Sequence, residues 1–361
     1  MAKTVAFGNN EYTEILTKLV PVDFIVDEFS SEKSAYNCPI VRLSEVSQAD
    51  NMINCVYNSR AAYAHLKLRS QGFKPIFIGD FVNRHPKEFA ATMLAQAQAG
   101  INEDFAIIER CLPYFADQQS RDELTAIVQF RYTLDIQHLM HFDVKIDQQY
   151  FENFVLNKKF NCLIDGGAYD GHDSIRFIEL FDPIHQVYLF EPNIKNIELI
   201  KSNIAKRNMT EFLSSGKITV KNACLSDKLG YAFLEGEGTE TKITKIFDKL
   251  PSSPRHEGNC AEEVSGYIET TSIDTEVSEM ITNDINARVL VKLDIEGAEM
   301  SALKGAIQSR DNENVGFAIS AYHLPHDLTD IFTWLQSSSI SRKYYFRHYS
   351  NGICESVLFA I

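Results

Sequence analysis

The sequence is poor in positive charge, and this excludes one broad class of function. It has 35 lysines and arginines against 49 aspartates and glutamates, which gives a formal net charge of −14 at pH 7. It contains no run of basic residues and no low-complexity tract. Because a nucleic-acid-binding surface needs a basic footprint to neutralise phosphates, we expect no nucleic-acid partner.

Long apolar runs and a signal-peptide pattern are also missing. No stretch approaches the roughly 20 apolar residues that cross a bilayer. Residues 1–8 lack the basic segment and apolar core of a secretory signal. We therefore expect a cytoplasmic protein without a membrane span. Hydrophobic residues still make up 45% of the 361 residues, enough to fill the cores of two domains.

Cysteine pairs with the spacing of a metal or redox site are absent. The seven cysteines stand apart at positions 38, 55, 111, 162, 224, 260 and 354, and none belongs to a Cys-x-x-Cys motif. An odd number of scattered cysteines favours reduced thiols and argues against a zinc site.

A stretch in the middle of the chain carries the clearest pattern. It consists of an apolar run at 160–164, Asp165, a glycine-rich turn at 166–171, a helical pattern at 174–180, a second apolar run at 186–190 and Glu191. Short apolar runs bounded by turn residues predict buried strands. Strand, glycine turn, helix, strand and acid form the βαβ arrangement of a nucleotide-binding α/β domain.

The glycine turn lacks two features of a dinucleotide site. From Gly166 it reads Gly-Gly-Ala-Tyr-Asp-Gly, so the second glycine of Gly-x-Gly-x-x-Gly is missing. It carries Asp165 and Asp170 and no lysine or arginine, and two carboxylates repel a pyrophosphate. They suit a cationic amine or sulfonium beside a ribose. Glu191, twenty residues past Gly171, can accept the ribose hydroxyls. The ligand that fits is S-adenosylmethionine.

Four motifs in this part of the chain resemble those of FkbM-type methyltransferases. They are Ile-Asp-Gly-Gly-Ala-Tyr-Asp-Gly at 164–171, Phe-Glu-Pro-Asn at 190–193, Asn-Ala-Cys-Leu-Ser-Asp at 222–227 and Val-Lys-Leu-Asp-Ile-Glu-Gly-Ala-Glu at 291–299. Their order and spacing match that family. The resemblance implies S-adenosylmethionine-dependent O-methylation, commonly of a sugar or polyketide-type hydroxyl. A sugar of a surface polysaccharide pathway is the preferred acceptor.

Strands and helices continue to alternate to the end of the chain. Further strands are predicted at 218–223, 289–293, 317–321, 343–347 and 356–360. The last two form a hairpin at the antiparallel edge. These five strands and the two central strands make the seven-stranded sheet of a class I methyltransferase. We also predict an extra strand at 231–234 and an insertion loop over 235–265, where glycine, serine, proline and charged residues accumulate.

Three domains or segments are expected. Residues 1–84 have the pattern of a smaller Rossmann-like α/β domain, residues 85–147 are mostly helical and bridge the domains, and residues 148–361 form the methyltransferase domain. Gly8 and Asp27 have nearly the spacing of a nucleotide site, but the glycine fingerprint is otherwise absent. The N-terminal domain is therefore either a second nucleotide or sugar-nucleotide site or, as we favour, a structural or partner-binding module.

The cofactor site is expected at the carboxyl edge of the sheet, where open α/β sheets bind their ligands. The predicted cofactor-binding residues are Asp165, Gly166, Gly167, Ala168, Tyr169, Gly171, Ser174, Glu191, Pro192, Asn193, Leu225, Ser226 and Asp294. Asp165 has an alternative role as a helix cap or turn former. Ser226 has one in an ordinary turn with Asp227.

Asp294, His323 and Lys292 are the predicted catalytic residues. Alternation puts Lys292 and Asp294 on one face of a strand, and Asp294 ends that strand near the methyl donor. His323 follows the next strand, where a pKa near the working pH would let it take a proton from an acceptor hydroxyl. Its alternative is a surface or capping role. His348 is a weaker candidate base, and His172 is expected to touch the cofactor.

The sequence leaves a divalent cation open. Glu296 and Glu299 are three residues apart, so they share a face if a helix begins there. With Asp294 they would offer the oxygen ligands that such a cation takes. The alternative is a capping aspartate and two glutamates at the positive end of a helix.

Three classes of function compete. The first is a methyltransferase with a small-molecule or saccharide acceptor. The second is a module that binds the cofactor or a nucleotide sugar without catalysis. The third is an NAD-dependent oxidoreductase. The presence of both Asp165 and Glu191 favours the first, and the missing glycine opposes the third. The sequence leaves open whether the chain forms a homo-oligomer.

Overall fold

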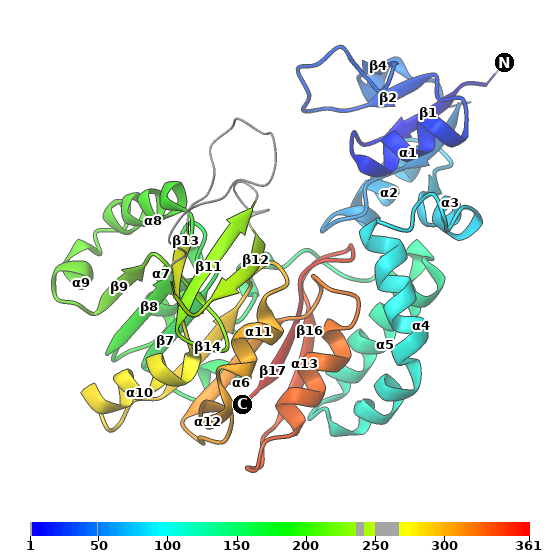
Figure 1. Cartoon of the computed structure of the whole chain (residues 1–361). Helices are drawn as coiled ribbons and strands as arrows, with labels where there is room; N and C mark the ends of the chain where they lie inside the picture. The colour runs from blue at the N-terminus through cyan, green and yellow to red at the C-terminus, as the bar shows by residue number, and fades with distance from the viewer. Residues whose placement is uncertain (1, 49, 236–241, 250–266) are drawn as a thin grey trace. The chain divides into compact units, whose positions relative to one another are not determined.

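The computed structural model of the chain describes residues 2–48, 50–235, 242–249 and 267–361 (Figure 1). Two compact units make up the chain. Unit 1 comprises Met1–Asp147, Leu324–Thr329 and Phe346–Ser356, and unit 2 comprises Gln148–His323, Asp330–Tyr345 and Val357–Ile361. The predicted domain boundaries after residues 84 and 147 stay predictions.

Unit 1 contains a six-stranded sheet with the order β3-β4-β2-β1-β5-β6. Its strands are β1 Thr4–Phe7, β2 Phe24–Val26, β3 Ser34–Ala35, β4 Cys38–Val41, β5 Asn51–Asn54 and β6 Ile76–Phe77. All pairings are parallel except that of β3 with β4. This confirms the predicted Rossmann-like α/β fold. The strands β3 and β4 escaped prediction because they are short, and β4 contains Pro39.

The first helices of unit 1 alternate with the strands along the sequence, and the later helices follow the last strand of the sheet. They are α1 Glu11–Leu19, η1 Leu43–Glu45, α2 Ala61–Ser70, α3 Gly79–Arg84, α4 Met93–Cys111, η2 Leu112–Tyr114, α5 Gln118–Thr133 and η3 Ile136–Leu139. The short 3-10 helix η4, Ile146–Gln148, follows. Within the segment 85–147, which was predicted to be mostly helical, α4 starts only after Thr92, whose backbone is extended, and continues to Cys111.

The N-termini of α1 and α2, which follow β1 and β5 in the sheet of unit 1, are occupied by protein groups. At α1, Asn10 Oδ1 accepts hydrogen bonds from the backbone N–H groups of Tyr12 and Thr13 at 3.0 and 3.3 Å. At α2, the carbonyl oxygen and Oδ1 of Asn351 accept two N–H groups of the first turn at 2.8 and 3.3 Å. Since phosphate binding uses free N–H groups at a helix start, this favours the structural-module interpretation of the N-terminal region.

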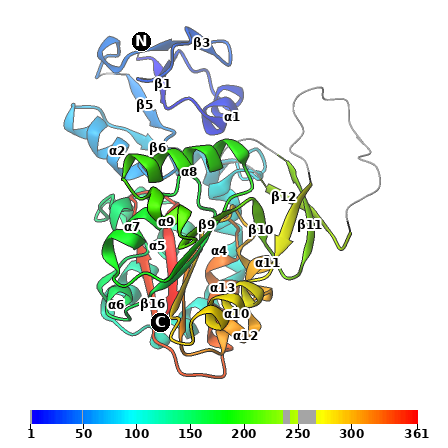
Figure 2. The same ribbon diagram turned by 90° about the vertical axis from the view of Figure 1, so that its left-hand side faces the viewer.

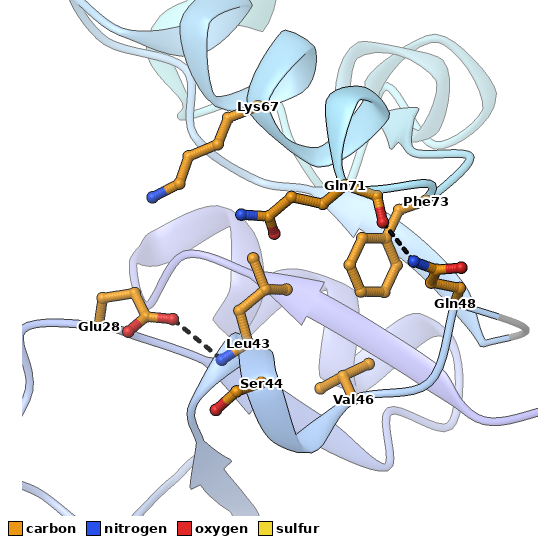
Figure 3. Close-up of a pocket in the computed structure, with 8 residues that line it drawn as sticks. All are labelled: Glu28, Leu43, Ser44, Val46, Gln48, Lys67, Gln71 and Phe73. Carbon is orange, nitrogen blue, oxygen red and sulfur yellow. Dashed lines mark hydrogen bonds between the residues drawn. The ribbon is translucent and has the colours of Figure 1, made fainter.

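A hollow of about 560 Å³ lies in unit 1 between η1 and α2 (Figure 3). Its lining residues are Glu28, Leu43, Ser44, Val46, Gln48, Lys67, Gln71 and Phe73. The connection from β4 to β5 contains a three-residue 3-10 turn in place of a helix, so it covers this face of the sheet thinly. Leu43 and Phe73 belong to the core cluster below, and Glu28 accepts the N–H of Leu43 at 2.9 Å.

Unit 2 is organised around the seven-stranded sheet, whose order is β16-β17-β15-β14-β7-β8-β9. The strands are β7 Cys162–Gly166, β8 Gln186–Phe190, β9 Ile218–Lys221, β14 Val289–Leu293, β15 Val315–Ser320, β16 Tyr344–His348 and β17 Ser356–Ala360. The pairs from β15 to β9 are parallel, and β17 is antiparallel to β15. This confirms the predicted class I methyltransferase sheet.

A second sheet of four strands accompanies it, with the order β10-β13-β11-β12. Its strands are β10 Ala223–Leu225, β11 Gly230–Glu235, β12 Lys242–Phe247 and β13 Tyr267–Thr271. The extra strand predicted at 231–234 is confirmed within β11. Two predictions are wrong: the strand expected over 218–223 stops at Lys221, and β12 lies inside the expected loop, where antiparallel pairing with β11 sets the backbone. Residues 236–241 and 250–266 of that loop lie outside the described residues.

Helices cover both faces of the seven-stranded sheet. They are α6 Asn153–Leu156, α7 His172–Leu180, α8 Ile194–Lys206, α9 Thr210–Ser214, α10 Ile273–Asn283, α11 Glu299–Lys304, α12 Ile307–Arg310 and α13 Asp327–Gln336. Figure 2 shows α6 and α7 on one side and α10, α12 and α13 on the other. The strands β7, β14 and β15 are buried along their whole length, which is why they read as continuous apolar runs.

Two expectations concern the helices and the cysteines: that no helix spans a membrane and that the thiols are reduced. In the described part of the chain, none of the helices is both long and apolar enough to cross a membrane. The six described cysteines, at 38, 55, 111, 162, 224 and 354, are free. Cys260 lies outside the described residues.

The cap of α1 yields a stability prediction. Asn10→Ala removes the acceptor of two backbone N–H groups, so we expect the free energy of unfolding to fall by about 1 kcal/mol in urea denaturation. Asn10→Asp is the matched control, because it keeps the acceptor oxygen and loses only the Nδ2 bond to the Cys55 carbonyl. If both variants lose the same stability, the bond to Cys55 and not the cap is responsible.

Candidate active site

The turn after β7 is held between its two neighbouring strands. The N–H groups of Gly167 and Ala168 both donate to the Phe190 carbonyl at 3.1 Å, and Asp294 N donates to the Gly166 carbonyl at 3.0 Å. Gly167 has a φ of +75°, and a Cβ there would lie 1.9 Å from the carbonyl oxygen of Asp294. Only glycine fits this position, since any side chain would push the turn away from Asp294.

The turn then leaves one side chain outside and starts a helix without a side-chain cap. Tyr169 adopts a φ of +48°, and its side chain is 48% exposed. Gly171, with a φ of +77°, precedes α7 and provides no capping side chain. Apart from the N–H of His172, the first N–H groups of α7 have no side-chain acceptor among the described residues, so they are available for a ligand or water. His172 is exposed at this edge, and its N–H donates to Asp170.

Glu191 lies at the end of β8 and is buried against the same turn. Its Oε2 accepts the N–H of Tyr169 at 2.9 Å, and its Oε1 accepts Asn193 N at 2.9 Å and Asn196 Nδ2 at 3.2 Å. Burial raises the pKa of Glu191, while these hydrogen bonds act in the opposite direction. Each carboxylate oxygen has two lone pairs, so Oε1 is filled by its two bonds, whereas Oε2 accepts only one and retains capacity for a ligand.

A buried ion pair connects β7 to β14. Asp165 and Lys292 are partners in the register of the two strands, and Lys292 Nζ lies 2.9 Å from Asp165 Oδ1. Ser174 Oγ donates to Asp165 Oδ2 at 2.7 Å, and Lys292 Nζ donates to the Gly167 carbonyl at 3.0 Å. Both side chains are almost completely buried. Asp165 and Lys292 therefore hold the glycine turn in place through Ser174 and the Gly167 carbonyl.

Carboxylates surround Lys292. Its Nζ lies 3.4 Å from Asp173 as well as 2.9 Å from Asp165. Burial lowers the pKa of Lys292, but Asp165, Asp173 and Asp294 together raise it, and the net direction is upward. Lys292 therefore keeps its proton and cannot act as a base. Burial and the neighbouring carboxylates raise the pKa of Asp173 to about 6, against the influence of Lys292.

Two tyrosines hold Asp294 at the end of β14. Tyr150 OH donates to Asp294 Oδ2 at 2.9 Å, and Tyr322 OH donates to Oδ1 at 3.2 Å. The Tyr150 hydroxyl also lies 3.0 Å from Ser320 Oγ. Burial, and then the charge of Asp294, raise the pKa of Tyr150 well above its usual value, so this phenol stays neutral. About a quarter of the Asp294 side chain is exposed, at 24%, so a ligand can reach it.

His323 lies between carboxylates on both sides of its ring. Its Nδ1 lies 3.0 Å from Glu299 Oε1, and its Nε2 lies 3.4 Å from Asp294 Oδ1 and 3.7 Å from Glu296 Oε2. Burial lowers the pKa of His323, but Glu299, Asp294 and Glu296 outweigh it and raise the pKa to about 9. The expected pKa near working pH is therefore wrong, because His323 is a cation at neutral pH.

The condition for a shared helical face of Glu296 and Glu299 is not met. The helix α11 begins only at Glu299, and Glu296 lies before it with a left-handed φ of +54°. Asp294, Glu299 and His323 nevertheless offer ligand atoms within 4.8 Å of one another, a donor set that suits a divalent cation. A cation would bond one ring nitrogen, whereas a protonated imidazole donates from both, and both nitrogens of His323 face carboxylates.

Leu225 and Ser226, two of the predicted cofactor-binding residues, have different environments in the structure. Leu225 packs on the glycine turn, because a Cβ on Gly166 would lie 2.9 Å from its Cδ1. Ser226 does not follow a strand of the seven-stranded sheet as expected, since it follows β10 of the four-stranded sheet. It is fully buried, and its N–H donates to Thr271 O at 2.8 Å. Pro192 and Asn193 lead into α8, where Asn193 caps the helix.

Several functional candidates escaped the sequence analysis. Tyr150, Asp173 and Asn196 were not predicted, although the acid in the first turn after the glycine turn was a signal for Asp173. His348 does not join this cluster. It is buried in unit 1 against Ser356 and the Gly352 carbonyl, where burial lowers its pKa to about 3.

The sequence and the fold were compared with known proteins. No curated protein matched the sequence significantly. The family description that matches is the Methyltransferase FkbM domain, over residues 165–347. The crystal structure of Methyltransferase FkbM from Methylobacillus flagellatus KT matches with 20% identity and a TM-score of 0.71, covering 100% of this chain and 90% of that one. At this identity the likeness shows a shared fold.

A second solved structure, the O-methyltransferase from Bacillus cereus in complex with SAH, is 11% identical. It covers 72% of this chain and 99% of its own, and its TM-score of 0.35 is too low to support an argument. The family match stands by itself, because residues 165–347 are just over half of the chain and include Asp165, Glu191, Lys292, Asp294 and His323. The chain belongs to the FkbM methyltransferase family.

Proposed function

We propose that the protein is an S-adenosylmethionine-dependent O-methyltransferase that acts on a hydroxyl of a sugar or of a related polysaccharide or natural-product precursor. The observation that supports it most is the position of Asp294. Its carboxylate is partly exposed, is oriented by the phenols of Tyr150 and Tyr322, and adjoins the glycine turn through the bond from Asp294 N to Gly166 O. The choice of a sugar rests on family analogy, and a fold alone does not fix a substrate.

The charge at this edge of the sheet favours a sulfonium cofactor. Asp165, Asp173 and Asp294 bring three carboxylates to one buried ammonium, that of Lys292, so negative charge is in excess when all are ionised. A positive sulfonium is attracted there, and a pyrophosphate is repelled. In this proposal Glu191 Oε2, which accepts the N–H of Tyr169, also accepts a ribose hydroxyl.

The proposed reaction is an in-line displacement. The acceptor oxygen attacks the methyl carbon as the carbon–sulfur bond breaks, and the electron pair of that bond stays on sulfur. The hydroxyl proton passes to the Asp294 carboxylate. Alignment of donor and acceptor supplies most of the acceleration, because the sulfonium is already a strong electrophile. Tyr150 and Tyr322 are positioning residues, since they act through Asp294.

His323 has a different role in this proposal from the one expected. Because His323 is already protonated, it cannot take the proton of the hydroxyl that is methylated. It instead holds Asp294 and Glu299 in place as a charged partner, with its Nε2 3.4 Å from Asp294 Oδ1 and its Nδ1 3.0 Å from Glu299 Oε1. We infer that the proton, and not a divalent cation, fills this cluster. A cytoplasmic location is part of the proposal, and the free thiols of the described cysteines are compatible with it.

The role of Asp294 can be tested with Asp294→Asn. We expect kcat for methyl transfer to fall roughly 10²- to 10⁴-fold, because the amide cannot accept the proton. Affinity for S-adenosylhomocysteine, which lacks the sulfonium charge, should fall far less than kcat. The assay follows labelled methyl from S-adenosylmethionine to a panel of sugars and nucleotide sugars. Tyr322→Phe is the control, since it removes one hydrogen bond to Asp294 and leaves the carboxylate. Unchanged turnover of Asp294→Asn would remove Asp294 as the proton acceptor.

The charged state of His323 predicts how stability depends on pH. Its pKa is about 9 in the folded protein against 6.5 as the ordinary value, so the native state binds the proton more tightly. The resulting stabilisation is complete below pH 6.5 and is lost as the pH rises through 9. We expect the free energy of unfolding to fall by on the order of 3 kcal/mol over this interval.

His323→Gln should abolish that fall, and His172→Gln, at an exposed position, should retain it. Urea denaturation at several pH values makes the measurement. A His323→Gln protein with the same pH dependence as the wild type would show that the imidazole is not held as a cation.

The assignment of a proton to the cluster can be tested by metal removal. If His323 donates to carboxylates from both ring nitrogens, treatment with EDTA should leave methyl transfer unchanged, and added Mg²⁺ should not raise it. Loss of turnover in EDTA that Mg²⁺ restores would instead assign a cation to Asp294, Glu299 and His323.

A further inference from the structure

A pocket in unit 2 lies at the edge of the seven-stranded sheet that the proposed active site does not use. It encloses about 400 Å³, and its lining includes Phe154, Asn157, Lys158, Arg342, Lys343 and Tyr345. Three of these side chains carry positive charge. No aspartate or glutamate is among the described residues that line it.

The strand directions separate this pocket from the proposed methyl-transfer site. Lys158 precedes β7 and Lys343 precedes β16, whereas Glu191 and Asp294 follow the carboxyl ends of β8 and β14. The strands β7 and β14 have five residues each, so each spans about 17 Å. The pocket therefore lies at the amino edge of the sheet and cannot share a small ligand with the carboxyl edge.

Positive charge is concentrated around this pocket, where the one neighbouring carboxylate that acts on the pKa of a lining cation is that of Asp311, on Arg342. Burial lowers the pKa of Lys158, and three further cations, Arg288, Arg342 and Lys343, lower it more. This is the signature of like charges held near one another. In a chain with a net charge of −14, such a cluster is unusual. An anion in the pocket would offset the repulsion.

The guanidinium of Arg342 is already used by the protein backbone. It donates to the carbonyl oxygens of Arg310, Asn312 and Val315 at 2.6 to 3.1 Å. Arg342 thus contributes its charge and a rigid wall. By contrast, the ammonium groups of Lys158 and Lys343 have no hydrogen bond or ion pair to any of the described residues, so their N–H donors are available to a ligand.

The remaining walls suit a small molecule with an anionic group. Phe154 and Tyr345 stack with ring centroids 3.8 Å apart and an angle of 5°, and Phe154 also meets the edge of Phe359. This gives a firm apolar wall, while Asn157 adds a neutral donor. The volume falls in the range of roughly 300–1,000 Å³ that is usual for small-molecule sites.

We propose that this pocket binds a small phosphorylated ligand, with the ammonium groups of Lys158 and Lys343 on the phosphate. Lysine commonly binds phosphate as a point charge, and a doubly charged group gains the most from two ammoniums. A long polyanion is the less suitable ligand, because the chain as a whole repels it and the pocket holds only a small molecule.

The test is calorimetric titration of the full chain at low ionic strength with inorganic pyrophosphate, glucose 1-phosphate and glucose. We expect both phosphorylated probes to bind and glucose not to bind. Binding should weaken by roughly tenfold for each ammonium removed in Lys158→Gln/Lys343→Gln. Binding of pyrophosphate alone would still support the phosphate site and would identify the free anion as its source.

The control is Lys201→Gln/Lys304→Gln, which removes the same charge from exposed positions on α8 and α11. It should bind both probes as the wild type does. The proposal is overturned if the wild type binds neither probe, if both double variants lose binding equally, or if only a single-stranded oligonucleotide binds. S-adenosylhomocysteine affinity should be the same in all variants, so failure here leaves the proposed function untouched.

Discussion

The buried ion pair between Asp165 and Lys292 is the interaction on which the rest of the site depends. It joins β7 to β14 in register, and Lys292 also donates to the Gly167 carbonyl. The two strands it connects carry the glycine turn and Asp294 at their ends. Removing one partner of such a pair leaves an uncompensated buried charge, typically at a cost of roughly 3–5 kcal/mol. The pair thus couples the stability of the sheet to the geometry of the site.

The same cation organises the charge above it. Lys292 interacts electrostatically with Asp165, Asp173 and Asp294. His323 interacts in the same way with Asp294, Glu296 and Glu299, so Asp294 belongs to both groups. Asp294 is therefore oriented by three groups, the phenols of Tyr150 and Tyr322 and the His323 cation. In the proposed reaction, a carboxylate held in this way needs little reorganisation when the acceptor hydroxyl approaches, which favours proton transfer.

Much of this could be predicted from the sequence, because the central strands are continuous apolar runs that end in acids. That pattern identified β7, β8 and β14 together with Asp165, Glu191 and Asp294. It could not identify Tyr150, which reaches Asp294 from 144 positions away. Nor could it predict the raised pKa of His323, which results from three carboxylates that the turn before α11 brings together. The position of Ser226 was missed because apolar periodicity does not tell which of two sheets a strand joins.

The most direct test of the central claim is calorimetric titration of the purified protein with S-adenosylhomocysteine, with NAD titrated in parallel. We expect saturable binding of S-adenosylhomocysteine alone, because the carboxylates at the sheet edge attract its cationic amine and repel a pyrophosphate. Binding of NAD would contradict the charge argument. No binding of S-adenosylhomocysteine would contradict the assignment of the cofactor to the glycine turn and Glu191.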